Sequence, residues 1–189
     1  MKPELVLHIC CAPDEAYVVD LLRESYDLHC FFCNPNIHPP EEYDLRLEEA
    51  RKVARHYGVA FTGDPYDQSL WTEAVAGLTH TPEGGERCRE CFLLRLGRTA
   101  AFCKSIGYPA FTTVMSISPH KRIAMLNETG AAAARVYGLT YEPFDFKKKD
   151  GFKKSIVLSR ELGLYRQDYC GCVLSRRESE ERKRGRVQA

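Results

Sequence analysis

Short apolar segments alternate with longer amphipathic segments along most of this chain, and this alternation is what most restricts its fold. The apolar segments, predicted as strands, cover residues 4–9, 27–33, 59–62, 110–114 and 140–146. Helices are predicted at residues 13–23, 41–56, 67–76, 88–106, 119–137 and 151–161. Strands that alternate with helices form parallel sheets with helices on both faces. We therefore expect a three-layer α/β fold.

No internal repeat or low-complexity linker divides the 189 residues, a length near that of one domain. We expect one catalytic α/β domain at residues 1–175, with an irregular, cysteine-bearing segment at residues 164–173, and a basic tail at residues 176–189. The apolar run Leu5 to Ile9 is too short for a signal peptide or a membrane span. We expect a cytoplasmic location and no membrane contact.

The total charge says little about partners, since 27 basic and 26 acidic residues give a net charge of +1. Positive charge is concentrated in the second half of the sequence. It gathers at Lys121-Arg122, at Lys147-Lys148-Lys149, and in a tail containing Arg176, Arg177, Arg182, Lys183, Arg184 and Arg186. Such runs form either solvated faces or nucleic-acid contacts.

Six of the nine cysteines form three close groups, Cys10-Cys11, Cys88-x2-Cys91 and Cys170-Gly171-Cys172. Disulfides do not persist in a reducing cytosol, so cysteines this close together are typical of metal ligands or catalytic thiols. An isolated cysteine is more often a small buried side chain. We therefore predict that Cys30, Cys33 and Cys103 pack in the interior.

The first cysteine group directly follows the first predicted strand. Ligands of parallel sheets bind beyond the carboxyl ends of the strands. Residues 112–121 leave the fourth strand at the same edge and supply hydroxyls, an imidazole and an ammonium group. Asp14 lies in the first turn of the following helix, either as a ligand beside Cys10 and Cys11 or as an ordinary helix-start carboxylate.

The other two groups also have ligand spacing. Cys88 and Cys91 lie on one face of a helical turn, a pattern shared by zinc, iron–sulfur and dithiol sites. Gly171 permits an unusual backbone conformation, so Cys170 and Cys172 can converge on a metal or form a strained disulfide. Six thiols and a carboxylate exceed the four ligands of a closed zinc site, whereas four thiolates suffice for an iron–sulfur cluster.

Four extended motifs contain these cysteines or lie near them at the same sheet edge. They are His8-x-Cys10-Cys11-x-Pro13, Glu86-Arg87-Cys88-x2-Cys91-Phe92-x2-Arg95-Leu96, Thr112-Thr113 with Ser118-Pro119-His120-Lys121, and Gln167-x-Tyr169-Cys170-Gly171-Cys172. Together they resemble the epoxyqueuosine reductases of the QueH type, over roughly residues 5–175. Many members carry a further cysteine where this chain has Asp14. The expected fold is a Rossmann-like, HUP-type parallel-sheet domain.

The resemblance implies the last step of queuosine synthesis. Two electrons remove the epoxide oxygen of epoxyqueuosine at the wobble position of tRNA and leave an alkene. The resemblance also implies a 4Fe-4S cluster, no corrinoid, and an electron donor that the sequence does not identify. The radical-SAM motif CxxxCxxC and the ATP-pyrophosphatase loop SGGxDS are both absent from the sequence.

The same resemblance assigns residues to this chemistry. The expected cluster ligands are Cys10, Cys11, Cys88 and Cys91. The expected catalytic residues are Asp14, Cys170, Cys172 and His120. Cys170 and Cys172 form either a redox-active dithiol or, with Asp14, the ligands of an additional iron that would bind the epoxide oxygen.

Recognition of an anticodon loop combines phosphate contacts with stacking on aromatic rings. Phosphate contacts are predicted for Lys121, Arg122, Arg176 and Arg177, with Lys147 to Lys149 as further candidates. Tyr169, Phe92 and His120 are predicted to line the pocket. Solvated charge and core packing are the alternative roles of these residues.

Two other classes of protein fit part of the pattern. A zinc-organised tRNA-binding module would use Cys88, Cys91, Cys170 and Cys172 as a tetrahedral set, and it would leave Cys10-Cys11 unexplained. A thiol–disulfide oxidoreductase would need only one of the cysteine pairs.

Overall fold

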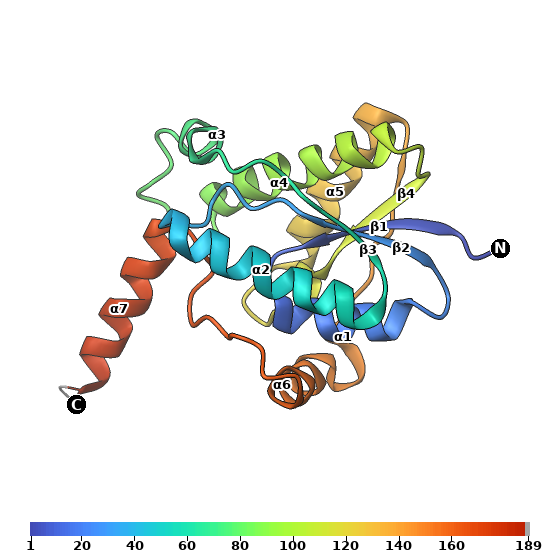
Figure 1. Ribbon diagram of the computed structural model, residues 1–189. Helices are drawn as coiled ribbons and strands as arrows, with labels where there is room; N and C mark the ends of the chain where they lie inside the picture. Colours follow the sequence, from blue (N-terminus) through green and yellow to red (C-terminus); the bar gives the residue numbers. More distant parts are fainter. Residues whose placement is uncertain (188–189) are drawn as a thin grey trace.

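A five-stranded parallel sheet forms the centre of the computed structural model, which describes residues 1–187, with side chains through residue 185 (Figure 1). Its strands are β1 (Glu4–Ile9), β2 (Asp27–Phe32), β3 (Ala60–Gly63), β4 (Ala110–Thr113) and β5 (Thr140–Tyr141). Their order across the sheet is β3-β2-β1-β4-β5, and every neighbouring pair is parallel. The predicted parallel α/β architecture is confirmed.

Helices cover both faces of this sheet, as Figure 1 shows. One face carries α1 (Ala12–Leu22) and α2 (Pro40–Tyr57), with α6 (Gly151–Glu161) packed on α1. The other face carries α4 (Glu86–Ser105) and α5 (Ile123–Tyr137). The short α3 (Gln68–Ala74) packs on α4, and α7 (Val173–Val187) follows the last loop. Two short 3-10 turns are η1 (Val114–Ile117) and η2 (Lys148–Asp150).

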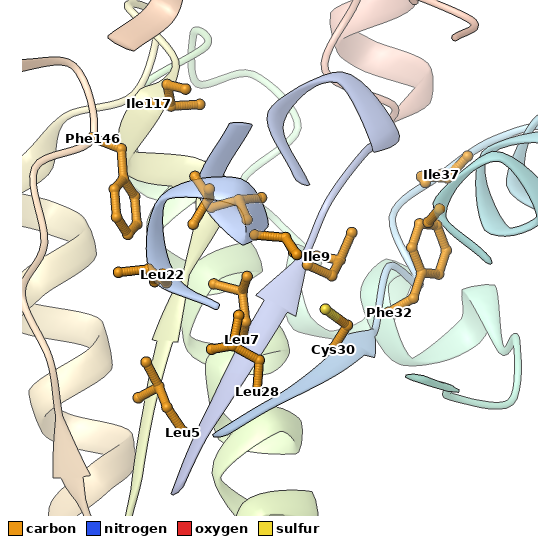
Figure 2. Close-up of a cluster of buried hydrophobic side chains, with 14 of the residues drawn as sticks. Leu5, Leu7, Ile9, Leu22, Leu28, Cys30, Phe32, Ile37, Ile117 and Phe146 are labelled. Carbon is orange, nitrogen blue, oxygen red and sulfur yellow. The ribbon is translucent and has the colours of Figure 1, made fainter. Parts of the chain in front are cut away.

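The alternation of side chains along β1 divides the core into two layers. Leu5, Leu7 and Ile9 pack toward α1 and α2, while Val6 packs toward α4 and α5. Figure 2 shows the first layer, in which these three side chains meet Leu28, Cys30 and Phe32 of β2. Because successive strand residues point to opposite faces, a strand buried on both sides is apolar throughout.

The fifth strand and the fifth long helix are both shorter than predicted. β5 ends at Tyr141 because it is an edge strand, and Pro143 has no N–H to donate. The following residues leave the sheet, and Phe146 packs into the core. α5 begins at Ile123, since the Thr113 hydroxyl caps η1 and residues 118–121 form a turn.

The predicted basic tail coincides with most of α7. Ser175 and Ser179 of this helix are buried, and Glu178 forms an ion pair with Arg87 at 2.5 Å. The first turns of α7 therefore pack on the start of α4, with the irregular segment 162–172 before them. Residues 188–189 of the tail lie outside the described residues. Within residues 1–187, no helix combines the length and hydropathy needed to cross a membrane.

Two helical glycines differ in the space that a side chain would find. A Cβ at Gly130 of α5 would collide with the ring of Tyr141, whereas a Cβ at Gly97 of α4 would meet nothing within 4 Å. We expect Gly130→Ala to lower the free energy of unfolding by about 1–3 kcal/mol through overpacking. Gly97→Ala, the matched control, should raise it by about 0.5–1 kcal/mol. Urea unfolding measures both, and equal effects of the two changes would contradict this packing.

Candidate metal centre

The order in which successive strands join the sheet reverses between β1 and β4. From β1 the chain moves through β2 to β3 on one side, and it then returns to place β4 and β5 on the other side. Such a switch point leaves a crevice at the carboxyl ends of the two central strands. Cys10 and Cys11 follow β1 at this crevice, and η1 follows β4.

Cys10, Cys11 and Asp14 converge at the start of α1. The two sulfurs and one Asp14 oxygen all lie within 4.8 Å of one another. Cys10 Sγ is 3.8 Å from Cys11 Sγ and 3.8 Å from Asp14 Oδ2. Cys11 is the N-cap of α1, so the turn from strand to helix brings both sulfurs to one side. The predicted grouping of Asp14 with the two cysteines is what the structure contains.

Proximity also sets the protonation of this trio. The hydrogen bond from Cys10 lowers the pKa of Cys11 to about 5, while the same bond and burial raise the pKa of Cys10 well above its usual value. Burial and the Cys11 thiolate raise the pKa of Asp14. At neutral pH Cys11 is therefore a thiolate and Cys10 keeps its proton, while Asp14 is shifted toward its protonated form. Metal binding to such a group releases those protons.

The first turns of α4 hold the second cysteine pair. Cys88 Sγ accepts a hydrogen bond from the Gly84 N–H at 3.2 Å. Cys91 is buried in a small cluster with Trp71, Val75 and Cys172. Burial raises the pKa of Cys88, and it raises the pKa of Cys91 to about 12. Since burial disfavours free thiolates here, a bound cation is what would deprotonate this pair.

The Cys170-Gly171-Cys172 loop packs against the segment that follows β2. The His38 N–H donates to the Gly171 carbonyl at 2.9 Å, and Arg46 donates to the Cys170 carbonyl at 3.1 Å. Gly171 has a φ of +134°, and a Cβ there would crowd Ile37 and Asn36. The loop therefore requires glycine at this position.

The two sulfurs of this loop have different surroundings. Cys172 packs beside Cys91, and its sulfur accepts the Ser175 N–H at 3.3 Å. Cys170 lines the main cavity, where Lys121 Nζ lies 2.9 Å from its sulfur. Burial by itself raises the pKa of Cys170, but the charges of Lys121 and Arg95 outweigh burial and lower it. Cys170 is thus the more acidic thiol of this loop, and it faces the cavity.

A cavity of about 620 Å³ opens beside these groups. Its lining residues include Cys10, Cys11, Asp14, Cys170, His120 and Tyr169. Its volume lies within the range that small-molecule sites occupy. The predicted catalytic residues Asp14, Cys170 and His120 therefore share one chamber, while Cys172 lies behind its wall.

Other predicted residues are distributed differently. Lys121 is only 10 % exposed and pairs with Glu83 at 3.5 Å, so it lies inside the site rather than on an outer surface. Phe92 is packed between α4 and the sheet and does not line the cavity, so its predicted pocket role is wrong and its core role holds. Arg122, Arg176 and Arg177 are exposed. Arg176 pairs with Glu180 at 3.1 Å.

The three cysteines predicted to pack are indeed interior. Cys30 and Cys33 lie on opposite faces of the sheet. Cys33 donates to Asp64, and Cys103 donates to the carbonyls of Tyr108 and Ala110.

Three further residues shape the site without having been assigned a role from sequence. Arg95 and Gln167 line the cavity, and Arg46 holds the Cys170 loop. Arg95 follows Cys88 and Cys91 at i+7 and i+4, a spacing that already places it on their side of the helix. No sequence signal marks Arg46, because its partner is 124 residues away.

Solved structures with this fold include two proteins at 14% identity. A predicted subunit of tRNA methyltransferase from Methanocaldococcus jannaschii aligns over 83% of this chain and 74% of its own, with a TM-score of 0.59. The U34-tRNA thiolase NcsA from Methanococcus maripaludis, solved with its [4Fe-4S] cluster, aligns over 88% of this chain and 58% of its own, with a TM-score of 0.57. At this identity the matches concern the fold, and they confirm the Rossmann-like, HUP-type prediction.

The family model described as "Epoxyqueuosine reductase QueH" matches residues 5–178. A protein of that name from Streptococcus pyogenes serotype M1 is 36% identical, over 92% of this chain and 70% of its own. Another from Thermotoga maritima is 35% identical, over 97% of this chain and 98% of its own. Nearly the whole chain takes part in these matches, and all four motifs lie inside the matched range. The chain therefore belongs to the QueH family of epoxyqueuosine reductases.

Proposed function

We propose that this oxidoreductase removes the epoxide oxygen of epoxyqueuosine in the anticodon loop of tRNA, at an iron–sulfur centre held by its cysteines. The observation that carries the proposal is the convergence of Cys10, Cys11 and Asp14 within 4.8 Å, beside a cavity that Cys170 also lines. The reaction takes up two electrons and two protons, breaks both carbon–oxygen bonds of the epoxide, and releases an alkene and water.

The donor set fits an iron centre. Soft thiolates select iron–sulfur clusters, zinc and copper(I), and the fixed cations Arg95 and Lys121 offset the charge of several thiolates. Cys10, Cys11, Cys88 and Cys91 would hold a 4Fe-4S cluster, and Asp14 with Cys170 would hold an additional iron at the cavity. Such a centre supplies electrons singly and a Lewis acid for the epoxide oxygen.

The protein's own side chains would position the substrate and supply protons to it. Lys121 carries a hydrogen-bond donor 2.9 Å from Cys170 Sγ, at the wall of the cavity. A donor fixed there stabilises negative charge on an oxygen as its bonds break. His120 is exposed at the same cavity, where it can exchange protons with solvent.

The tRNA would approach along α7. A groove of about 460 Å³ adjoins the cavity, and the two share Asp168, Tyr169, Ser179 and Lys183 as lining residues. Tyr165 and Tyr169 line this groove together with Arg176. Aromatic rings beside cations suit a single-stranded loop, in which bases stack and phosphates pair with arginine. Arg122 and Arg177 are the further proposed phosphate contacts. The proposed location is the cytoplasm, where thiols stay reduced.

The two alternative functions are less well supported. A zinc module built on Cys88, Cys91, Cys170 and Cys172 leaves the trio of Cys10, Cys11 and Asp14 without a purpose. A thiol–disulfide oxidoreductase would use one of the three cysteine groups and would leave the other two without a function.

Replacing a proposed cluster ligand should remove the cofactor. We expect Cys10→Ala and Cys91→Ala to lose most bound iron and acid-labile sulfide, and with them the visible absorption and the reductase activity. Cys103→Ala is the control, because Cys103 is also an interior cysteine but donates only to backbone carbonyls. It should keep its iron while losing about 1 kcal/mol of stability. Full cofactor content in both ligand variants would exclude these ligands.

The additional iron can be counted separately. We expect Asp14→Ala to bind about one iron fewer per chain than the wild type, with unchanged acid-labile sulfide, because sulfide belongs only to the cluster. Anaerobically purified protein serves for both assays. A homogeneous, fully active wild-type preparation holding only the four irons of a cluster would remove the additional iron and leave Cys170 and Cys172 as a dithiol.

Charge removal on α7 tests the proposed tRNA path. The double change Arg176→Ala and Arg177→Ala should weaken tRNA binding and reduce the slope of log affinity against log salt by about 1.4, or about 0.7 for each lost contact. Arg135→Ala is the control, since Arg135 is exposed on α5 and lines neither the cavity nor the groove. An unchanged slope in the double variant removes this patch from the tRNA footprint.

A further inference from the structure

Arg95 differs from the other buried arginines in its partners. Arg46, Arg87 and Arg95 are 1 %, 3 % and 2 % exposed. Arg46 pairs with Glu42 at 2.7 Å, and Arg87 pairs with Glu178 at 2.5 Å. Arg95 has no carboxylate at ion-pair distance in the part of the chain that the structure describes. Its hydrogen bonds go to the Cys33 carbonyl at 3.4 Å and to Asn34 Oδ1 at 2.5 Å, which are both neutral.

A buried guanidinium needs a compensating negative charge. Neutral acceptors satisfy its N–H groups, but they do not replace the hydration of a full charge. The arginine side chain keeps its proton in proteins, so it cannot lower this cost by becoming neutral. The compensating anion must therefore come from groups other than aspartate and glutamate.

Cysteines that ligate a metal as thiolates would supply the negative charge that Arg95 lacks. Cys91 precedes Arg95 by one turn of α4, and Cys10 and Cys170 line the same cavity as Arg95. When these three cysteines lose their protons to become metal ligands, their negative charges compensate the buried cation. These three cysteines come from three separate segments of the chain, and Arg95 lies among them.

Neutral groups at the strand ends hold Arg95 in this position. Asn34, which accepts from Arg95, donates through its own amide to the Ile9 carbonyl at 2.9 Å. His8 Nε2 lies 3.1 Å from the Cys33 carbonyl, and its Nδ1 lies 2.9 Å from the Thr113 hydroxyl. The carbonyl and amide oxygens that accept from Arg95 carry no charge that would compensate it in place of the cysteines. The positive charge of Arg95 is consequently directed toward the cysteines.

We propose that Arg95 is a positioning residue whose fixed charge balances the anionic cysteine centre and makes its reduction more favourable. The proposal rests on the iron–sulfur centre of the proposed function. Reduction adds negative charge to such a centre. A cation buried beside it stabilises the reduced form most, because the interior screens the interaction weakly. Arg95 thus acts on electron uptake through the centre and does not need to touch the substrate.

Two changes alter this charge in different ways. Arg95→Gln removes it, and Asn34→Asp neutralises it in place by putting a carboxylate where the amide oxygen is 2.5 Å from the guanidinium. Both variants should make one-electron reduction at least tenfold less favourable, which is a downward shift of about 59 mV in the midpoint potential. Arg95→Lys keeps the charge and should recover most of the shift. A redox titration followed by absorption and EPR measures each potential.

Arg98→Gln is the matched control. Arg98 lies one turn further along α4, and its ion pair with Asp64 at 2.5 Å gives it a carboxylate partner of its own. This variant should keep the wild-type potential. If Arg95→Gln does not fold, Asn34→Asp still decides the question, because it leaves the arginine in place. A wild-type potential in a folded Arg95→Gln or Asn34→Asp protein overturns the proposal.

Iron and sulfide analysis of the wild type distinguishes a failure of the proposed function from a failure of the inference about Arg95. A wild type without bound iron and sulfide would end the proposed function before any variant is made. A loaded wild type with insensitive variants would end only the inference about Arg95.

Discussion

The parallel pairing of β1 with β2 on one side and β4 on the other is the constraint on which the site depends. It buries β1 on both faces, and it ends β1, β2 and β4 at one edge. Cys10 and Cys11, Asn34, and Thr113 with η1 therefore meet although they are far apart in sequence. The N-terminus of α1 then turns Asp14 toward both sulfurs.

The second constraint on the site is the balance of charge among its buried side chains. Several thiols gather where burial disfavours their ionisation, and only Cys11 and Cys170 have a lowered pKa among the six. Lys121 and Arg95 are buried beside them. The cations and the cysteines are each costly to bury alone, and together they form a group that could hold a metal ion. The outer cations of α7 are screened by solvent, and tRNA contact is the role proposed for them.

Much of this arrangement could be predicted from local patterns. Apolar periodicity located all five strands, since a strand buried on both faces must be apolar throughout. The spacing of Cys10, Cys11 and Asp14 across a strand–helix junction indicated their grouping. Predictions that depended on distant partners were less accurate. Phe92 packs in the core, Lys121 is enclosed by Cys170 and Glu83, and Pro143 with Phe146 shortens β5.

Periodicity and motifs within short stretches were enough to establish the sheet, helices α1 to α6, the three cysteine groups and the family, whereas α7 was not among the predicted helices. That Cys170 faces the cavity while Cys172 packs beside Cys91 is visible only in the folded molecule. It alone left Arg95 without a carboxylate partner among the described residues. The physical reason is that burial and charge compensation depend on which distant segments meet, as Arg46 and Cys170 do across 124 residues. No local pattern encodes such a meeting.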